Sequence, residues 1–414
     1  MKKKKSIFKE IAEQEEQEEL KEKDELAFAE QIEIDLLSKS ITLPQVKEIC
    51  KKYLLLPDDT IIDVILAVCC SIQFSGDPLW VFLQGASAGG KTELLRACIS
   101  ERNIHKDSLT SKTLVSGLRK GGIDPSLFAI INNKTLILKD FTNIFSMRKE
   151  DAQVIYSQFR NAYDGYYDPG SGGEAGHPHY ETHFAMLAGT TGVLQHYWAL
   201  RQQLGERYLI YAFPENKPMS LANRVEANKE IMQEMRRELR LNFGAFIKKF
   251  QDDISRATYT EALGTKIKYL SIFVTRARSY VHRNKFSREI DCPPEIEECS
   301  RLLLQLFLFL DVLCLIREKK EVTELEYSLI YKIATDSMPP ARFKVINFLS
   351  EDLDNFWITS LVAERLHLPT ESAKVILEDL NALKIVERTG INPLEWRLNP
   401  DFNEYLLNSK PESY

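Results

Sequence analysis

The sequence predicts an α/β protein with a parallel sheet at its centre, a helical segment before the sheet, a helical lid after it and a C-terminal winged helix. Short apolar segments typical of buried strands alternate with helical patterns, which indicates a parallel sheet covered on both faces. The first of these strands runs directly into a glycine-rich loop that opens a helix. With 414 residues, the chain exceeds what one hydrophobic core usually holds, so two or three folded units are expected.

Composition excludes several classes of protein. Hydrophobic residues make up 44% of the chain and charged residues 28%, with a mean hydropathy of -0.26, which excludes wholesale disorder. The longest apolar run, Leu302 to Ile316, is interrupted by polar residues and is shorter than the roughly 20 residues of a membrane span. We therefore expect a buried helix there and no membrane contact. The MKKKK start leads into acidic residues rather than an apolar segment, so we expect no secretory signal and a cytoplasmic protein.

The net charge limits how the chain can bind nucleic acid, and the cysteine pattern indicates the redox state of its thiols. The net charge of -6 argues against a protein that coats nucleic acid through bulk electrostatics. Residues 1–35 carry -5 and residues 341–414 carry -4, which leaves +3 for the middle of the chain. Any contact with DNA is therefore expected to be local and, if there is one, to involve that middle segment. No CxxC pair occurs, so the seven cysteines are expected to be reduced core residues: Cys50, Cys69, Cys70, Cys98, Cys292, Cys299 and Cys314.

Five segments follow one another along the chain. Residues 1–35 form a charged arm that should be solvated and could be helical, and its basic start is either solubilising or a tether for nucleic acid. Residues 36–76 have helical apolar spacing and should form a small layer of helices. The core with the sheet is expected at 77–215, the helical lid at 216–338 and the winged helix at 339–414.

The core carries a phosphate-binding loop between a strand and a helix. The sequence GASAGGKT fits the pattern GxxxxGK(S/T) in full. Glycines in this pattern let backbone N–H groups wrap phosphates, and the following helix points its positive end at them. We expect Gly85, Gly89 and Gly90 to form this cradle for ATP. The predicted strands are Leu79 to Leu83, Thr135 to Leu138, Phe184 to Leu187 and Tyr208 to Ala212.

Two further groups would complete a site for ATP and Mg²⁺. Lys91 can neutralise the β and γ phosphates, and the Thr92 hydroxyl can bind magnesium. A second magnesium-positioning carboxylate is expected at the end of a neighbouring strand, where Asp140 follows Leu136 to Lys139. Phe141 comes next, at the place where many such ATPases carry a glutamate that activates water. The general base is left unassigned, and the available carboxylates Glu93 and Asp124 are interpreted as solvated surface groups.

Two later strands bring further polar groups. Thr190 and Thr191 end the third strand, where a hydroxyl could reach the γ phosphate or the attacking water. Arg207 lies just ahead of the fourth strand. An arginine stays protonated and can neutralise phosphate charge across a subunit boundary. On the residues alone, an exposed salt bridge is the simpler interpretation of Arg207.

The succession of motifs resembles a known family. The motifs are GDPLWVFLQGASAGGKTELL, LILKDFTNIF, AYDGYYDPGSGG, FAMLAGTTG and LGERYLIYAF, within residues 55–290. Together they are similar to AAA+ ATPases, and most closely to the minichromosome-maintenance-like helicases of bacterial mobile elements such as staphylococcal cassette chromosomes. The resemblance implies a ring-shaped homo-hexamer that couples ATP hydrolysis to movement on single-stranded or forked DNA, with replication proteins as partners.

The resemblance also implies residue roles. Lys91 and Thr92 would belong to Walker A, Asp140 to Walker B, and Thr190 would be the first sensor. Arg207 would be the finger that acts on the ATP of a neighbouring subunit. The second sensor in the lid would be Arg276 or Arg278.

The same family carries a β-hairpin that points into the pore of the ring, and here it would lie within residues 163–183. Family hairpins usually place lysine or arginine at the tip, and this segment has neither. The side chains that could stack on bases or contact phosphates are Tyr166, Tyr167, His177 and His179. Histidines 177, 179 and 183 also have metal-ligand spacing, but no cysteine completes a set, so we favour an exposed hairpin.

The C-terminal unit is interpreted as a winged helix. Its helices are expected at 342–349, 359–366 and 370–383, and its wing at 385–398. The third helix would enter a DNA groove, yet it carries more acidic than basic residues. We therefore favour a structural or partner-docking role. The basic residues to test for DNA contact are Lys374, Lys384, Arg388 and Arg397.

Two functions from different classes stay open. The first is a DNA-dependent motor, favoured by the family resemblance. The second is an ATP-controlled assembly or regulatory module in which nucleotide orders a ring and the winged helix recruits a partner. Phe141 and the uncharged hairpin tip favour the second.

Overall fold

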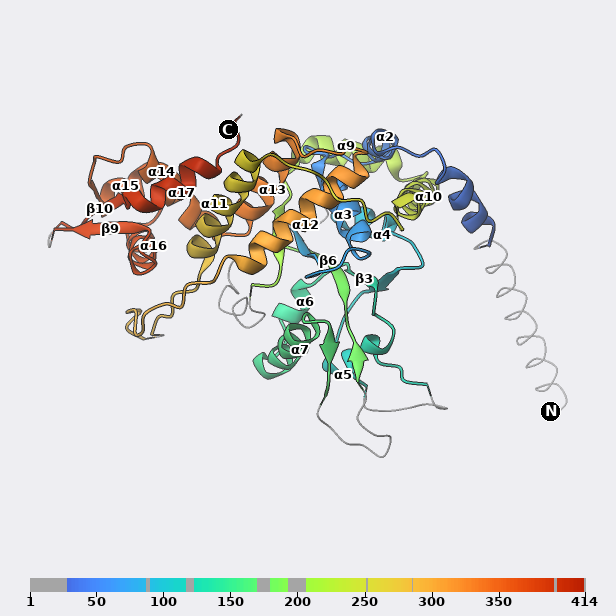
Figure 1. Ribbon diagram of the computed structural model, residues 1–414, viewed down its shortest axis with the longest axis horizontal. Helices are drawn as coiled ribbons and strands as arrows, with labels where there is room; N and C mark the ends of the chain where they lie inside the picture. The colour runs from blue at the N-terminus through green and yellow to red at the C-terminus, as the bar shows by residue number, and fades with distance from the viewer. Residues whose placement is uncertain are drawn as a thin grey trace.

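A five-stranded sheet forms the centre of the computed structural model, and each pair of neighbouring strands runs parallel (Figure 1). The described residues are 28–86, 90–116, 123–169, 179–192, 206–250, 252–284, 286–390 and 393–412. The strands are β1 (Trp80–Gln84), β2 (Asn103–Lys106), β3 (Lys134–Leu138), β6 (Phe184–Thr190) and β7 (Leu209–Ala212). The predicted α/β class with a parallel sheet is confirmed.

The strand order is β2-β3-β6-β1-β7. The chain passes from β1 to the far edge at β2, returns through β3 and β6, and then crosses to the other side of β1 as β7. The carboxyl end of β1 therefore lies at the point where the order of the strands reverses. In open α/β sheets, ligands bind in the crevice outside the carboxyl ends of the strands at such a point.

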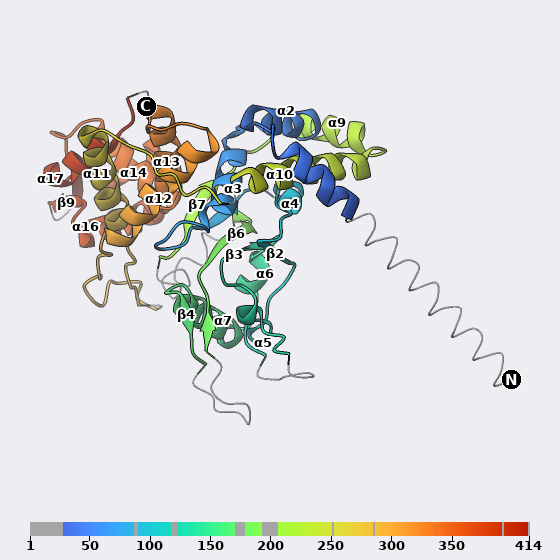
Figure 2. The same ribbon diagram turned by 45° about the vertical axis from the view of Figure 1, so that its right-hand side comes forward.

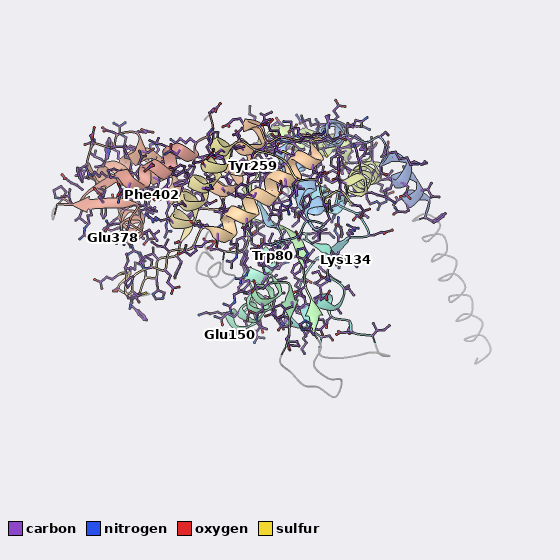
Figure 3. The ribbon with its side chains drawn as sticks, viewed as in Figure 1. Trp80, Lys134, Glu150, Tyr259, Glu378 and Phe402 are labelled. Atoms are coloured by element: carbon purple, nitrogen blue, oxygen red, sulfur yellow. The ribbon has the colours of Figure 1, made fainter. Side chains whose placement is uncertain are left out.

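Both faces of the sheet are buried, because helices cover each of them. Val81 and Leu83 of β1 pack into the cluster that holds α3 (Thr60–Ser71) and α12 (Ser300–Ile316). Trp80, labelled in Figure 3, points to the other face, and its ring lies 5.8 Å from that of Phe159 in α7 (Lys149–Ala162). A strand buried on both faces needs apolar side chains in both directions, which explains why the strands are continuously apolar.

The four predicted strands are present, with ends that differ by up to three residues. The third is the one that differs most, because β6 continues to Thr190. Strand β2, which pairs with β3 at the edge of the sheet, was not predicted. All four of its residues are half-buried, and the segment Asn-Ile-His-Lys lacks the apolar run that marks the inner strands.

Helices surround the sheet in the regions where helical spacing predicted them. They are α2 (Leu43–Tyr53), α3, α4 (Lys91–Ala97), α7, α9 (Pro218–Asn228), α10 (Met232–Phe250), α11 (Glu261–Arg278), α12 and α13 (Glu324–Asp336). Figure 2 shows α2, α9 and α10 together beside α4. These three elements belong to the predicted helical segment and to the predicted lid, so both segments meet next to the phosphate loop.

The last part of the charged arm is docked on the protein. Residues 28–37 are helical. Three ion pairs join this helix to α10: Arg237 with Glu33, Arg240 with Glu30, and Lys248 with Asp35. This part of the arm is therefore more than a solvated extension. Residues 1–27, which include the proposed tether, lie outside the described residues.

The helices and hairpin predicted after residue 339 are present. They are α14 (Pro340–Ser350), α15 (Thr359–Arg365), α16 (Thr370–Ala382), β9 (Val386–Thr389) and β10 (Glu395–Leu398). Two further elements, β8 (Trp357–Ile358) and α17 (Pro400–Ser409), were not predicted. Phe402 of α17, labelled in Figure 3, lies 5.6 Å from the ring of Phe273 in α11. One continuous hydrophobic cluster thus joins the C-terminal unit to α11 and α12.

Candidate functional site

Three strands end together at the carboxyl edge of the sheet, and a residue that the sequence singled out lies at or just after the end of each. Gly85 follows β1, Asp140 follows β3, and Thr190 is the last residue of β6. Backbone hydrogen bonds join the three segments. The Gly85 N–H donates to the Thr190 carbonyl over 3.2 Å, and the Phe141 N–H donates to the Gly189 carbonyl over 2.8 Å. The predicted constellation is therefore brought together by the parallel order of the strands.

Glycines are required at both described ends of the phosphate loop. A β-carbon on Gly85 would lie 3.1 Å from the β-carbon of Phe213 and 3.3 Å from the Nζ of Lys91. Gly90 has a φ of +90°, a backbone conformation that L side chains rarely adopt. Helix α4 begins immediately after it. Gly89 lies outside the described residues.

Lys91 is folded onto the loop. Its side chain is largely buried, and its Nζ donates to the carbonyl oxygen of Ala86 over 2.5 Å. Burial lowers the pKa of Lys91, and the nearby carboxylate of Asp140 opposes that shift. A cation held over a glycine loop at the start of a helix, close to a carboxylate, is a charge arrangement suited to phosphate with a metal ion.

Asp140 and Thr92 are both exposed at this edge. The Oδ1 of Asp140 accepts a hydrogen bond of 2.8 Å from the Thr142 N–H, which fixes the carboxylate at the end of β3. Thr92 is the second residue of α4. Hydroxyl and carboxylate oxygens are the donors that Mg²⁺ prefers, so these two side chains fit that ion.

Phe141 cannot act as a base, and its role is structural. Its ring is fully buried and lies 4.8 Å from that of Phe82.

The interpretation of Glu93 as a solvated group is wrong. Arg236 of α10 donates to both of its carboxylate oxygens over 2.8 Å, and Arg96 donates to Oε1 over 2.8 Å. Burial is the largest influence and would raise the pKa of Glu93, but the hydrogen bonds and charges of Arg236 and Arg96 together outweigh it and hold the pKa below its usual value.

Asp124 is held away from the loop. It accepts hydrogen bonds from the Tyr180 hydroxyl over 2.7 Å and from the Ser126 N–H over 2.9 Å. Tyr180 belongs to β5 (Tyr180–Glu181), which precedes β6. Asp124 is therefore placed near the amino ends of the strands, so it lies at the wrong edge of the sheet to serve as a base at the loop.

The two threonines at the end of β6 differ in burial. Thr190 is almost fully buried and pairs in register with Gln84, the residue before Gly85. Its hydroxyl makes a contact of 3.3 Å with the Thr191 carbonyl. Thr191 is half-buried. Thr190 thus borders the start of the phosphate loop.

Arg207 lies at the opposite end of the strands from the phosphate loop. It precedes β7, which runs parallel to β1, so it is at the amino ends of the strands while Lys91 follows the carboxyl ends. Its guanidinium lies 5.5 Å from the centre of the Tyr163 ring, and its Nη2 is 3.4 Å from Asp164 Oδ1. Burial, followed by the charge of Arg301, lowers the pKa of Arg207. Arg207 therefore cannot reach the loop of its own chain.

The structure does not bring Arg276 or Arg278 to the loop. Arg278 is fully buried, donates to Glu297 over 2.7 Å and to the Glu206 carbonyl over 3.4 Å, and so supports the turn that precedes Arg207. The guanidinium of Arg276 lies 6.0 Å from the Phe402 ring of α17. The sequence could not separate a sensor from a structural arginine, because both residues lie two positions apart on one amphipathic helix, α11.

A cavity beside the loop was not predicted. It has a volume of about 240 Å³ and lies between the end of α2, the start of α4 and the helices α9 and α10. Arg224 of α9 is on its wall and donates to the Lys52 carbonyl over 2.5 Å. The lining residues are Tyr53, Leu54, Leu55, Gly90, Thr92, Glu93, Leu221, Arg224, Val225, Asn228, Met232 and Met235.

The predicted hairpin is present at its base. Its strands are β4 (Tyr166–Tyr167) and β5. Tyr166 is 58% exposed, and its ring stacks on that of the exposed His179 at 5.9 Å. Tyr167 is half-buried against Phe128 at 5.2 Å, which leaves it less free to contact a ligand. His177 and the tip lie outside the described residues.

The third C-terminal helix is partly covered by the chain itself. Arg283 donates to Asp379 over 2.8 Å and to Glu378 over 3.2 Å, both on α16, where Figure 3 labels Glu378. Of the four basic residues to test for DNA contact, Lys374, Lys384 and Arg388 are exposed. Arg397 donates to Glu387 over 2.7 Å.

Among the helices of the described part of the chain, none combines the length and the apolar character that a membrane span requires. The predicted site residues that lie close together in the structure are those of the phosphate loop and of the ends of β3 and β6, and the cavity adjoins them. Comparisons with protein-family models and with curated proteins give no match to this sequence.

Proposed function

We propose that the chain binds ATP with Mg²⁺ at the phosphate loop and hydrolyses it as an AAA+ motor that acts on DNA. The observation that carries the proposal is the convergence of Lys91, Asp140 and Thr190 at one edge of a parallel sheet, where β1 enters a glycine loop. Such a crevice at the reversal of strand order is where nucleotides bind in α/β proteins.

Lys91 would neutralise phosphate charge, and Thr92 with Asp140 would hold Mg²⁺. The bound Mg²⁺ would withdraw negative charge from the phosphate oxygens. Lys91 is already desolvated and attracted by Asp140, so only a short movement of its Nζ away from the Ala86 carbonyl is needed to meet an anion.

The cavity beside the loop would hold the nucleoside. Tyr53 and Leu54 from the end of α2 face Met232 and Met235 of α10 across it. Flat bases are bound largely by apolar contact, and methionine adapts well to an aromatic surface. Arg236 pins α10 to Glu93 of α4, so nucleotide in this cavity would contact both the loop and the lid.

A close backbone contact gives a direct test of the convergence. A β-carbon on Gly189 would lie 2.4 Å from the Lys139 carbonyl oxygen, so Gly189→Ala must displace the chain that carries Asp140. We expect ATP turnover to fall by roughly 10²-fold, the effect of a misplacement of about 1 Å. The matched control is Gly192→Ala, because a β-carbon there meets no atom within 4 Å. A folded Gly189→Ala protein with normal turnover would contradict the proposed site.

The position of Arg207 supports an assembly of several copies. It lies at the amino ends of the strands, away from its own loop, where burial and then the charge of Arg301 lower its pKa. A ring with head-to-tail contacts places one edge of each subunit against the opposite edge of the next. Arg207 of one copy would then serve the ATP of its neighbour, in keeping with the hexamer that the family resemblance implies.

DNA is the proposed substrate of the motor, and the exposed Tyr166 on the hairpin would stack on bases. The rival, an ATP-controlled assembly module, is favoured by Phe141, because the residue directly after Asp140 is a buried phenyl ring that cannot accept a proton. The covering of α16 by Arg283 also favours a docking role for the proposed winged helix.

Turnover and unwinding separate the two functions. For a motor, single-stranded DNA is expected to stimulate ATP turnover, and a forked duplex is expected to be unwound by the wild type but not by Lys91→Ala. The measurements are phosphate release with and without DNA, and strand separation on a labelled fork. Turnover that DNA leaves unchanged, together with no strand separation, would rule out the motor and favour the assembly module.

A further inference from the structure

The segment between α11 and α12 forms a second hairpin away from the sheet. Arg283 and Ile290 make an antiparallel bridge, and Figure 1 shows the chain leaving α11, projecting outward and returning to α12. The Asn284 side chain accepts hydrogen bonds from the backbone N–H groups of Phe286 (2.8 Å) and Ser287 (3.2 Å), which shapes the outer turn. The base of this hairpin has polar side chains that the proposed ATPase does not use.

Three side chains with metal-binding atoms meet at that base. His282 and Asp291 lie one position outside the bridge, on opposite arms, and Cys292 follows Asp291. The Nδ1 of His282 is 2.6 Å from the Oδ1 of Asp291. One ligand atom from each of the three residues lies within 4.8 Å of the other two, and all three are exposed. Among the described residues, this is the one group of three or more such side chains.

Cys292 also departs from the expectation for cysteines. Five of the seven are buried as predicted, and Cys299 is half-buried, but Cys292 is exposed. The interpretation of Cys292 as a core residue is therefore wrong, because the segment that carries it leaves the helical layer. An exposed thiol beside a paired histidine and carboxylate is a set of donors rather than a packing group.

We propose that His282, Asp291 and Cys292 bind a zinc ion. Nitrogen, oxygen and thiolate sulfur are the donors that zinc takes in proteins, and three protein ligands leave a fourth position for water. With bonds of about 2.0 to 2.3 Å, the donors of a tetrahedral site lie roughly 3.3 to 3.6 Å apart. Because all three side chains are exposed, rotations of the side chains alone can open the His282 to Asp291 contact to that spacing.

The neighbouring charges favour this assignment. Arg283 is the cation adjacent to His282, but its guanidinium is engaged by Asp379 and Glu378 of α16. It therefore does not occupy the carboxylate of Asp291. Zinc would link the two arms of the hairpin at their base and so fix the turn that exposes Phe286, which is 97% accessible. This inference does not depend on the proposed ATPase activity.

Cobalt titration of the full chain tests the site. The protein should carry no polyhistidine tag and should be kept reduced with a phosphine, because dithiols bind zinc. We expect one equivalent of Co²⁺ to produce a thiolate-to-cobalt charge-transfer band and the intense visible bands of tetrahedral cobalt, and we expect Zn²⁺ to remove both. No charge-transfer band with the wild-type chain would overturn the proposal.

Variants identify the ligands. Cys292→Ser should abolish the charge-transfer band, and His282→Ala should weaken zinc binding by at least about 100-fold, since loss of a mere outer-shell partner costs 10- to 100-fold. Cys299→Ser, which removes the next cysteine, should leave both unchanged. Because His282 and Cys292 are exposed, circular dichroism of these two variants should match that of the wild type. A band that survives in Cys292→Ser, or zinc affinity unchanged in His282→Ala, would overturn the assignment.

Discussion

Replacing Lys91 by alanine is expected to reduce ATP turnover by at least about 100-fold, the typical effect of removing one preorganised charge from a site that stabilises developing negative charge. The side chain sits at the start of α4, buried over the glycine loop, and its Nζ reaches the Ala86 carbonyl. Alanine keeps the helix but leaves the phosphates without that cation. Nucleotide affinity is expected to fall as well, because the phosphates lose this cation while the nearby carboxylate of Asp140 remains.

The matched control for this variant is Lys149→Ala. Lys149 is also the first residue of a helix, α7, but it is exposed and lies outside the phosphate loop. Phosphate release and fluorescent-nucleotide binding should therefore be normal in the control. Equal turnover in Lys91→Ala and the control would show that the loop does not carry the activity.

Replacing Arg207 by lysine is expected to lower turnover of the assembled protein by about 10³-fold or more, the range found when a finger arginine is absent. Lysine keeps the positive charge but lacks the planar fork that holds two phosphate oxygens at once. Because Arg207 is at the amino edge of the sheet, nucleotide binding to the loop of the same chain should be unchanged. The variant therefore separates turnover from binding.

Two measurements guard this result against a loss of structure. Arg207 contacts Tyr163 and Asp164, so thermal unfolding and the mass of the assembly should be compared with the wild type. Arg301→Lys is the control for a loss of packing around Tyr163, because the Arg301 guanidinium also lies over that ring, 6.0 Å from its centre. Full turnover in an assembled Arg207→Lys protein would remove Arg207 from the site.

The sequence was sufficient for the parts of the site that depend on local patterns. A glycine loop between an apolar strand and a helix predicts the position of Lys91, and strand ends predict Asp140 and Thr190. Parallel strands bring their carboxyl ends to one edge, so residues far apart in sequence could be expected together. The inner strands could also be placed, because burial on both faces makes them continuously apolar.

Features that depend on tertiary packing could not be predicted in this way. The cavity beside the loop needs α2, α9 and α10 to meet, and nothing in their separate patterns fixes that contact. The pairing of Glu93 with Arg236 joins residues 143 positions apart. Arg278 is the residue type expected of a sensor, but its side chain is buried against Glu297. The reason is that α11 packs on α12 and α17 and not on the loop.

The most direct test of a site shared between subunits is to mix two inactive variants. Lys91→Ala keeps Arg207 but lacks a working loop, and Arg207→Lys keeps the loop but lacks the arginine. In an equal mixture that reassembles at random, about one quarter of the contacts in a ring would pair an intact loop with an intact neighbouring arginine. We predict that the mixture regains ATP turnover toward about one quarter of the wild-type rate, in proportion to these contacts. A mixture no more active than its two components would contradict an ATP site completed by Arg207 of the next subunit.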